Sequence, residues 1–167
     1  MTGAPTRIVV MGVTSTGKSR TGARLARVLG LPFVDGDDLH PRRNRIKMAG
    51  GTPLDDTDRR PWLDRIGIAL AERPRVVACS ALKRRYRDRI RSHAGEVLFV
   101  HLHGPRAVIA RRMAAREGHF MPVSLLDSQL ATLEAPGPDE WVVRADIRRD
   151  PRAIVAGVLD RLRRPWR

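Results

Sequence analysis

The sequence contains a single cysteine, Cys79, which excludes an internal disulfide and agrees with a reducing cytoplasm. It also has no apolar run that approaches the roughly 18 residues of a membrane span. The N-terminus lacks the basic and then apolar pattern of a signal peptide. These absences predict a cytoplasmic protein with no membrane partner.

Lysines and aromatic residues are scarce as well. Only three of the 32 basic residues are lysines, and aromatic residues make up 4% of the chain, so few side chains could stack on bases. The formal net charge of +14 raises nucleic-acid binding as a hypothesis. Because the arginines are spread along the whole chain, we interpret most as solvated surface and a few as phosphate ligands. We therefore expect a negatively charged small substrate and no nucleic-acid partner.

The most informative stretch is residues 7–20, which read R-I-V-V-M-G-V-T-S-T-G-K-S-R. Residues 8–11 form a continuous apolar run, typical of a parallel strand buried on both faces. The next eight residues fit G-x-x-x-x-G-K-[ST] at every fixed position, and a helical pattern follows them. This context predicts a nucleotide-binding phosphate loop (P-loop) made of Gly12, Val13, Thr14, Ser15, Thr16, Gly17, Lys18 and Ser19.

The spacing of this loop suits phosphate capture. The glycines let the chain wind tightly, so that backbone N–H groups and the positive end of the next helix point at one anion. Lys18 would reach the outer phosphates, and Ser19 would offer its hydroxyl to Mg²⁺. The motif thus predicts binding of a nucleotide with Mg²⁺, but not the reaction.

Strand and helix patterns alternate along the chain, which indicates a parallel sheet covered on both faces. We expect five strands, at residues 8–11, 32–34, 75–79, 96–102 and 140–144. We expect helices at residues 18–29, 41–48, 55–70, 82–91, 105–116, 123–133 and 150–163. With no internal repeat or linker, the pattern predicts a single α/β domain over residues 1–167, a three-layer α/β/α fold with a five-stranded parallel sheet.

Two aspartates, Asp35 and Asp37, follow the second expected strand. Ligands gather at the carboxyl ends of the strands in an open parallel sheet, so both carboxylates can face the γ-phosphate. One could help hold Mg²⁺, and the other could accept a proton from an attacking hydroxyl. The alternative is an Asp-Gly turn followed by a helix cap at Asp38. The third strand runs into Ser80 without a Walker B aspartate, which favours a small-molecule kinase over a motor ATPase or GTPase.

A third group of candidate residues lies between the fourth and fifth strands. Arg112 and Arg116 are four residues apart, hence on one helix face, just before a G-H-F-M-P break at 118–122. A short segment that carries arginines suits a lid that excludes water and neutralises the transferred phosphoryl group. A solvated basic helix is the alternative. We predict a small helical lid at about residues 112–124, with both arginines catalytic.

Four blocks of sequence, taken in order, identify a family. They are D-G-D-D-L-H-P at 35–41, P-L-D-D-T-D-R-R-P-W-L at 53–63, C-S-A-L-K at 79–83 and G-H-F-M-P at 118–122. With the P-loop, the chain resembles the small P-loop gluconokinases, a family of the nucleoside-monophosphate-kinase and shikimate-kinase-like fold. It departs from the family at Ser15, where glycine is frequent, and at Ala135, where a second proline is common.

The resemblance implies phosphorylation of D-gluconate by ATP at the 6-hydroxyl, giving 6-phospho-D-gluconate and ADP, and commonly a homodimer. Carried over to this chain, Lys18 resembles the phosphate lysine and Ser19 the Mg²⁺ ligand, while Asp35 resembles a carboxylate that binds the metal directly or contacts one of its ligands. Asp37 resembles the residue that orients and deprotonates the sugar hydroxyl. The resemblance makes Arg112 and Arg116 the arginines of the lid.

Gluconate carries one carboxylate and a row of hydroxyls, so its pocket needs a fixed cation and several polar side chains. Arg59 begins a helix on the substrate side and could supply a bidentate fork. The alternative role for His40 is helix capping, and the alternative for Lys83 and Arg87 is a place on a solvated helix face. Besides Asp37 and Arg59, we expect contacts from His40, Asn44, Lys47, Lys83 and Arg87.

Two other functions stay open. Another kinase of this fold could take shikimate or a nucleoside monophosphate, although shikimate kinases would lack the D-x-D-R-x-P-W-L block at 56–63 and a monophosphate kinase would not need the second carboxylate. A nucleic-acid-binding P-loop protein would instead use the arginine surface, and its binding would weaken steeply with salt.

Overall fold

A computed structural model describes residues 5–118 and 122–165. Its centre is the predicted sheet of five parallel strands, and the order of the strands is β2-β3-β1-β4-β5. The strands are β1 (Arg7–Met11), β2 (Phe33–Asp35), β3 (Arg75–Ala78), β4 (Leu98–His103) and β5 (Val142–Asp146).

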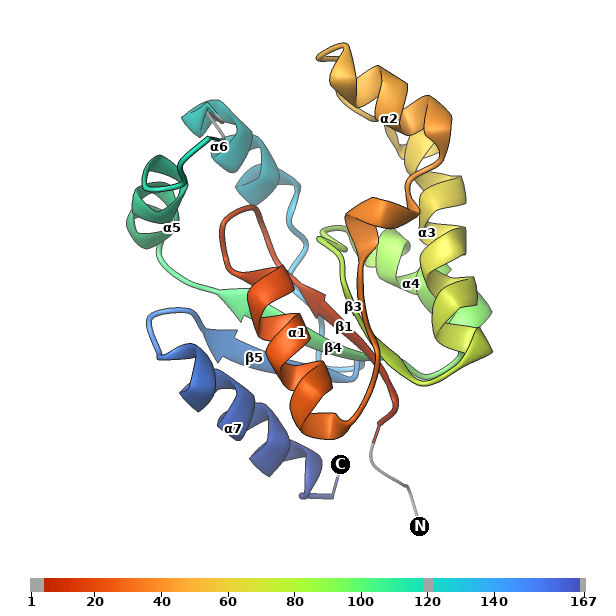
Figure 1. Ribbon diagram of the computed structural model, residues 1–167, viewed down its shortest axis with the longest axis vertical. Coiled ribbons are helices and arrows are strands. Elements are labelled where there is room, and N and C mark those ends of the chain that lie inside the picture. Colours follow the sequence, from red (N-terminus) through yellow and green to blue (C-terminus); the bar gives the residue numbers. More distant parts are fainter. Residues whose placement is uncertain (1–4, 119–121, 166–167) are drawn as a thin grey trace.

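Helices lie on both faces of the sheet and beyond its carboxyl end. Figure 1 shows α1 and α7 on one face, α3 and α4 on the other, and α2, α5 and α6 past the strand ends. The helices are α1 (Lys18–Leu29), α2 (Arg42–Ala49), α3 (Asp56–Glu72), α4 (Arg84–Ala94), α5 (Arg106–Ala114), α6 (Val123–Thr132) and α7 (Pro151–Leu162). A short 3-10 helix, η1 (Gly36–Leu39), follows β2 and was not predicted.

The central strand β1 is buried on both faces, which confirms the interpretation of its apolar run. Ile8 and Val10 belong to a core cluster shared with α1 and α7, whereas Val9 and Met11 belong to a second cluster shared with α3 and α4. All four side chains are inaccessible to solvent. The strand order reverses at β1, so the loop that leaves it opens at the switch point where open α/β sheets bind ligands.

Several boundaries differ from prediction because tertiary contacts hold the chain. The helix predicted from residue 82 begins at Arg84, since Ala81 takes a left-handed conformation with φ 45°. The strand predicted from residue 140 begins at Val142, because Glu140 lies in a turn and faces Arg87. Arg87 is the partner in both places: it donates to the Ala81 carbonyl, and it bonds Glu140, which is 53 residues away in sequence.

The predicted lid at about residues 112–124 includes 119–121, which lie outside the described residues. The expected helix through residue 116 ends at Ala114, so Arg112 lies in α5 and Arg116 follows it. Among the helices that the structure describes, none combines the length and apolarity needed to cross a membrane.

Candidate active site

A cavity of about 970 Å³ opens at the carboxyl end of the sheet, at the large end of the range for small-molecule sites. Most of the P-loop lines it, together with side chains from the ends of β2 and β3, from α5 and α6, and from the turn before α7. These elements surround the loop after β1 in Figure 1. The lining brings together the predicted residues Lys18, Ser19, Asp35, Asp37, Arg112 and Arg116.

The P-loop backbone has the curvature that phosphate binding requires. A Cβ on Gly12 would come within 2.6 Å of the Leu102 carbonyl oxygen, so the loop can pass the end of β4 only with glycine there. Ser15 and Gly17 are left-handed, with φ 61° and 86°. Such alternation turns successive N–H groups into one concavity. Ser15, the departure from the family pattern, thus occupies a position whose backbone favours glycine.

Two groups of the loop that could donate hydrogen bonds to a phosphate donate instead to protein oxygens in this structure. Lys18 Nζ donates to the Val13 carbonyl at 2.9 Å, and the Thr14 N–H donates to Gln129 Oε1 at 2.7 Å. Burial lowers the pKa of Lys18, and the charge of nearby Arg116 lowers it further, whereas Asp37 opposes the shift. Lys18 therefore lies close enough to Arg116 and Asp37 for both charges to affect its pKa.

The two aspartates where β2 runs into η1 are held by an Asx turn. Asp35 Oδ1 accepts from the Asp37 N–H at 3.0 Å, and Asp35 Oδ2 accepts from Ser19 Oγ at 2.7 Å. The cap of η1 is thus Asp35 rather than Asp38, and the same carboxylate also faces the P-loop. Burial and the neighbouring charge of Asp35 raise the pKa of Asp37. A raised pKa strengthens Asp37 as a proton acceptor.

Ser19 and Asp35 form an oxygen-only donor pair, which fits Mg²⁺. This ion takes one or two protein oxygens and completes its shell with water and phosphate oxygens. Within residues 5–118 and 122–165, no group of three or more His, Cys, Asp or Glu side chains could hold a metal alone. The donor set therefore suits a cation that arrives with a nucleotide.

Two further residues of the cavity were not assigned a role from sequence. Gln129 bonds the P-loop from α6, and Arg149 lines the cavity from the turn before α7. Arg112 bonds the same turn, because it donates to the Ile147 carbonyl at 2.5 Å. The position of Arg149 after the fifth strand is a usable signal, because parallel strands end at the same edge. In a chain so rich in arginine, that signal did not stand out.

Comparisons with known proteins agree with this site. A family model described as shikimate kinase matches residues 14–136. A gluconokinase of Gluconobacter oxydans is 46% identical, with 90% of this chain and 88% of that protein aligned. The crystal structure of a gluconokinase from Sinorhizobium meliloti is 49% identical, with a TM-score of 0.87 over 96% of this chain and 93% of that one.

This chain belongs to the gluconokinase family. The family predicted from the four sequence blocks is thereby confirmed. Shikimate kinase of Aquifex aeolicus, at 18% identity and a TM-score of 0.61, covers 94% of this chain and shares the fold.

The residues that we expected to contact gluconate lie mostly at the junction of α2, α3 and α4, not in the walls of the main cavity. His40 stacks on Trp62, with ring centroids 4.3 Å apart. Asn44 Nδ2 donates to the Asp58 carbonyl at 2.9 Å and lies 3.3 Å from His40 Nδ1. Since this nitrogen of Asn44 is a donor, His40 Nδ1 accepts and its Nε2 carries the hydrogen.

Burial, then the charges of Arg45 and Arg59, lowers the pKa of His40 to about 4. His40 is therefore a neutral hydrogen-bond donor at neutral pH. Asn44 Oδ1 is buried with no protein partner among the described residues, which leaves an acceptor at this junction.

The cations of this junction are held by aspartates of the first turn of α3. Lys47 Nζ lies 2.5 Å from Asp58 Oδ2, and Lys83 Nζ lies 3.3 Å from Asp56 Oδ1. Arg59 Nη1 donates to Tyr86 Oη at 3.3 Å. Asp58 also closes the capping box that starts α3, so the turn that orders the helix also positions these cations.

One prediction is corrected. Arg87, expected to contact gluconate, has no exposed surface and lies inside the protein. Its guanidinium bonds both carboxylate oxygens of Glu140, at 2.7 and 2.9 Å, and two backbone carbonyls. The helical spacing could not reveal this partner, because Glu140 is 53 residues away in sequence.

Proposed function

We propose that this chain transfers the γ-phosphoryl group of ATP to the 6-hydroxyl of D-gluconate, giving 6-phospho-D-gluconate and ADP. The observation that carries the proposal is one cavity that is lined both by residues 14–19 of the P-loop and by Asp35 and Asp37, whose charges act on Lys18. Membership of the gluconokinase family agrees with it.

In this proposal each cavity residue has one task. The P-loop N–H groups and Lys18 bind the phosphates, and Asp37 orients the sugar hydroxyl and accepts its proton. Arg112 and Arg116 offset the negative charge on the transferred group. Ser19 and Asp35 would hold Mg²⁺, which would neutralise charge on the phosphate oxygens.

Gluconate would bind on the α2–α3 side, next to Asp37. Arg59 is the cation that we assign to its carboxylate, because its guanidinium is half-buried and is already held beside the Tyr86 ring, 5.7 Å from the centroid. A guanidinium group that is ordered before binding loses less conformational entropy when it pairs with a carboxylate. His40, Asn44, Lys47 and Lys83 remain candidate partners for the hydroxyls.

The test is ADP release with Mg-ATP and a panel of D-gluconate, shikimate, glycerate and AMP, with a control that lacks an acceptor. We expect turnover with gluconate and only background rates with the other compounds. Turnover with shikimate or AMP, or equal rates in the control, would remove the gluconate assignment and leave the family and fold in place.

Replacing Arg59 with alanine should raise the KM for gluconate at least about tenfold, because a charge-assisted hydrogen bond contributes roughly 1.5–3 kcal/mol. The KM for ATP should stay within about twofold, since Arg59 lies outside the phosphate cavity. Initial rates with each substrate varied in turn measure both constants. Arg60→Ala, at the exposed neighbouring position, is the control and should leave both constants unchanged. An Arg59→Ala effect confined to ATP would place gluconate elsewhere.

We also infer a cytoplasmic homodimer that binds no nucleic acid. Much of the arginine surface is already paired with carboxylates, as in Arg84–Asp139 at 2.7 Å and Arg89–Asp64 at 2.7 Å. Light scattering on the purified protein tests the dimer. Retention on DNA or RNA at moderate salt would contradict the absence of a nucleic-acid partner.

A further inference from the structure

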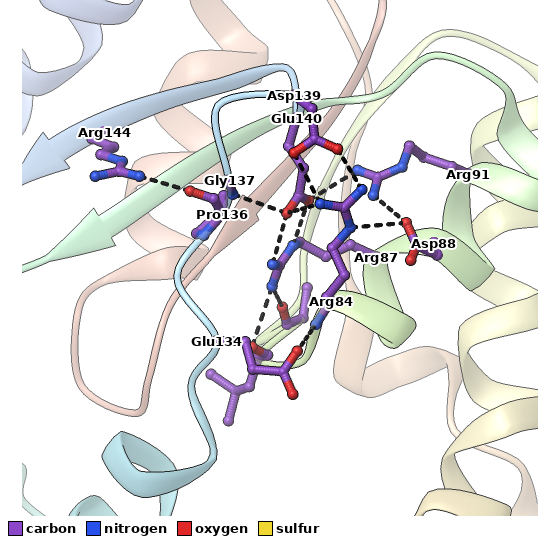
Figure 2. Close-up of polar contacts among 12 residues, drawn as sticks. Arg84, Arg87, Asp88, Arg91, Glu134, Pro136, Gly137, Asp139, Glu140 and Arg144 are labelled. Carbon is purple, nitrogen blue, oxygen red and sulfur yellow. Dashed lines mark hydrogen bonds and ion pairs between the residues drawn. The ribbon is translucent and has the colours of Figure 1, made fainter.

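Arg87 of α4 and Glu140, just before β5, form an ion pair in the protein interior. Their side chains are 0% and 1% exposed, and two parallel hydrogen bonds of 2.7 and 2.9 Å join them. Figure 2 shows the pair at the centre of a polar network that ties α4 to the chain between α6 and β5. Its position away from the cavity leaves it without a role in the proposed reaction.

The remaining donors of Arg87 hold a strained turn. Arg87 Nη1 donates to the Ala81 carbonyl at 2.9 Å and to the Leu82 carbonyl at 3.2 Å. Ala81 has φ 45°, a left-handed conformation that a residue with a Cβ adopts only when its surroundings impose it. The guanidinium therefore fixes a backbone conformation that the local sequence does not favour.

This turn contacts the P-loop directly. Ser80, which precedes Ala81, lines the cavity, and its carbonyl accepts from the Gly12 N–H at 3.3 Å. A shift of the turn would thus reach the first glycine of the P-loop, whose backbone has little room against β4.

The same turn contacts the P-loop indirectly, through α6. The Leu82 carbonyl also accepts from the Glu134 N–H at 2.8 Å, and Glu134 Oε2 accepts from the Arg84 N–H at 2.8 Å. Glu134 follows α6 closely, and Gln129 of that helix accepts from the Thr14 N–H. The turn is therefore connected to the P-loop at two points, directly at Gly12 and through α6 at Thr14.

The charge state of the pair is stable. Burial alone would raise the pKa of Glu140, but hydrogen bonds from Arg87 and the Gly137 N–H outweigh burial and lower the pKa to about 2. A buried ion pair can often be exchanged for apolar residues without loss of stability. Apolar residues could fill the space here, but they could not donate to the two carbonyls of the turn.

We propose that Arg87 and Glu140 are positioning residues for nucleotide binding, which hold the turn at 80–82 and, through it, the P-loop and Gln129 in the geometry that receives the phosphates. The proposal rests on the proposed use of ATP but not on gluconate as the acceptor.

The test compares variants in calorimetric titration with a non-hydrolysable ATP analogue and Mg²⁺, because the titration reports affinity and the fraction of competent sites separately. Glu140→Gln should weaken binding at least about fivefold with a stoichiometry near one, since the amide cannot hold the guanidinium in place. The control is Asp139→Asn, which removes the exposed partner of Arg84 in the same network and should bind as the wild type.

The double variant Arg87→Met with Glu140→Leu separates positioning from stability. It should keep its melting temperature within a few degrees and still bind the analogue at least about fivefold more weakly. Arg87→Lys keeps the charge but loses the planar set of donors, so it should also fold and bind the analogue more weakly. This variant tests the proposal if another variant fails to fold.

Wild-type affinity in the folded double variant, or in Arg87→Lys, would overturn the proposal and reduce the pair to a structural element. Failure of the wild type to bind the analogue would instead contradict ATP use itself. Normal binding by the wild type without turnover on gluconate would remove only the proposed substrate, and the positioning test would stand.

Discussion

Asp37→Asn should lower kcat at least about a hundredfold while ATP binds with nearly unchanged affinity, because the lost step is proton acceptance. The asparagine side chain has the same shape but cannot take the proton of the sugar hydroxyl. Burial and the charge of Asp35 raise the pKa of Asp37, and the pair lies near Lys18, so the carboxylate is both basic and close to the phosphate site. Steady-state kinetics and analogue titration measure the two quantities.

Asp38→Asn is the matched control, since Asp38 is an exposed neighbour outside the cavity lining, and it should leave kcat within about twofold. The pH profile adds a second readout. Because the pKa of Asp37 is raised, activity should fall on the acid side at a higher pH than an ordinary carboxylate would cause. Near-normal turnover in Asp37→Asn would mean that another group, or the phosphate itself, accepts the proton.

Gly36→Ala should lower kcat at least about tenfold, because misplacing catalytic groups by about 1 Å costs up to a hundredfold. A Cβ at Gly36 would clash with the Ala78 carbonyl oxygen, which belongs to strand β3 and cannot move aside. Relief must come from the turn that carries Asp35 and Asp37, so both carboxylates would leave their positions. We also expect a loss of roughly 1–3 kcal/mol in the free energy of unfolding, as for overpacked sites.

Gly50→Ala is the control for this substitution. Gly50 has φ −79°, and its nearest neighbours would lie 3.5 Å from an added Cβ, so alanine fits without strain. Chemical denaturation and steady-state kinetics on both variants separate the two effects. Full activity in Gly36→Ala would show that the turn can move without disturbing the function proposed for Asp35 and Asp37.

Local sequence was sufficient for the elements on which the site is built. The apolar run of β1, the P-loop spacing and the Asp-rich start of α3 each depend on residues adjacent in the chain, and each is present in the structure. Parallel strands end at one edge, so the P-loop, Asp35 and Asp37 could be placed in one cavity before any contact was known.

The partners of buried polar groups could not be predicted in the same way. The sequence around Arg87 does not distinguish it from an arginine on a solvated helix face. Its partner Glu140 is 53 residues away in sequence and reaches it only through the packing of the fold. Gln129 reaches the P-loop across 115 residues, and His40 finds Trp62 from a different element. Spacing along the chain defines strands, turns and helix faces, because these depend on neighbouring residues. The pairing of charges in the interior depends on how the elements pack. A buried charge without a partner costs too much free energy, and the partner that packing brings to it can come from any part of the chain.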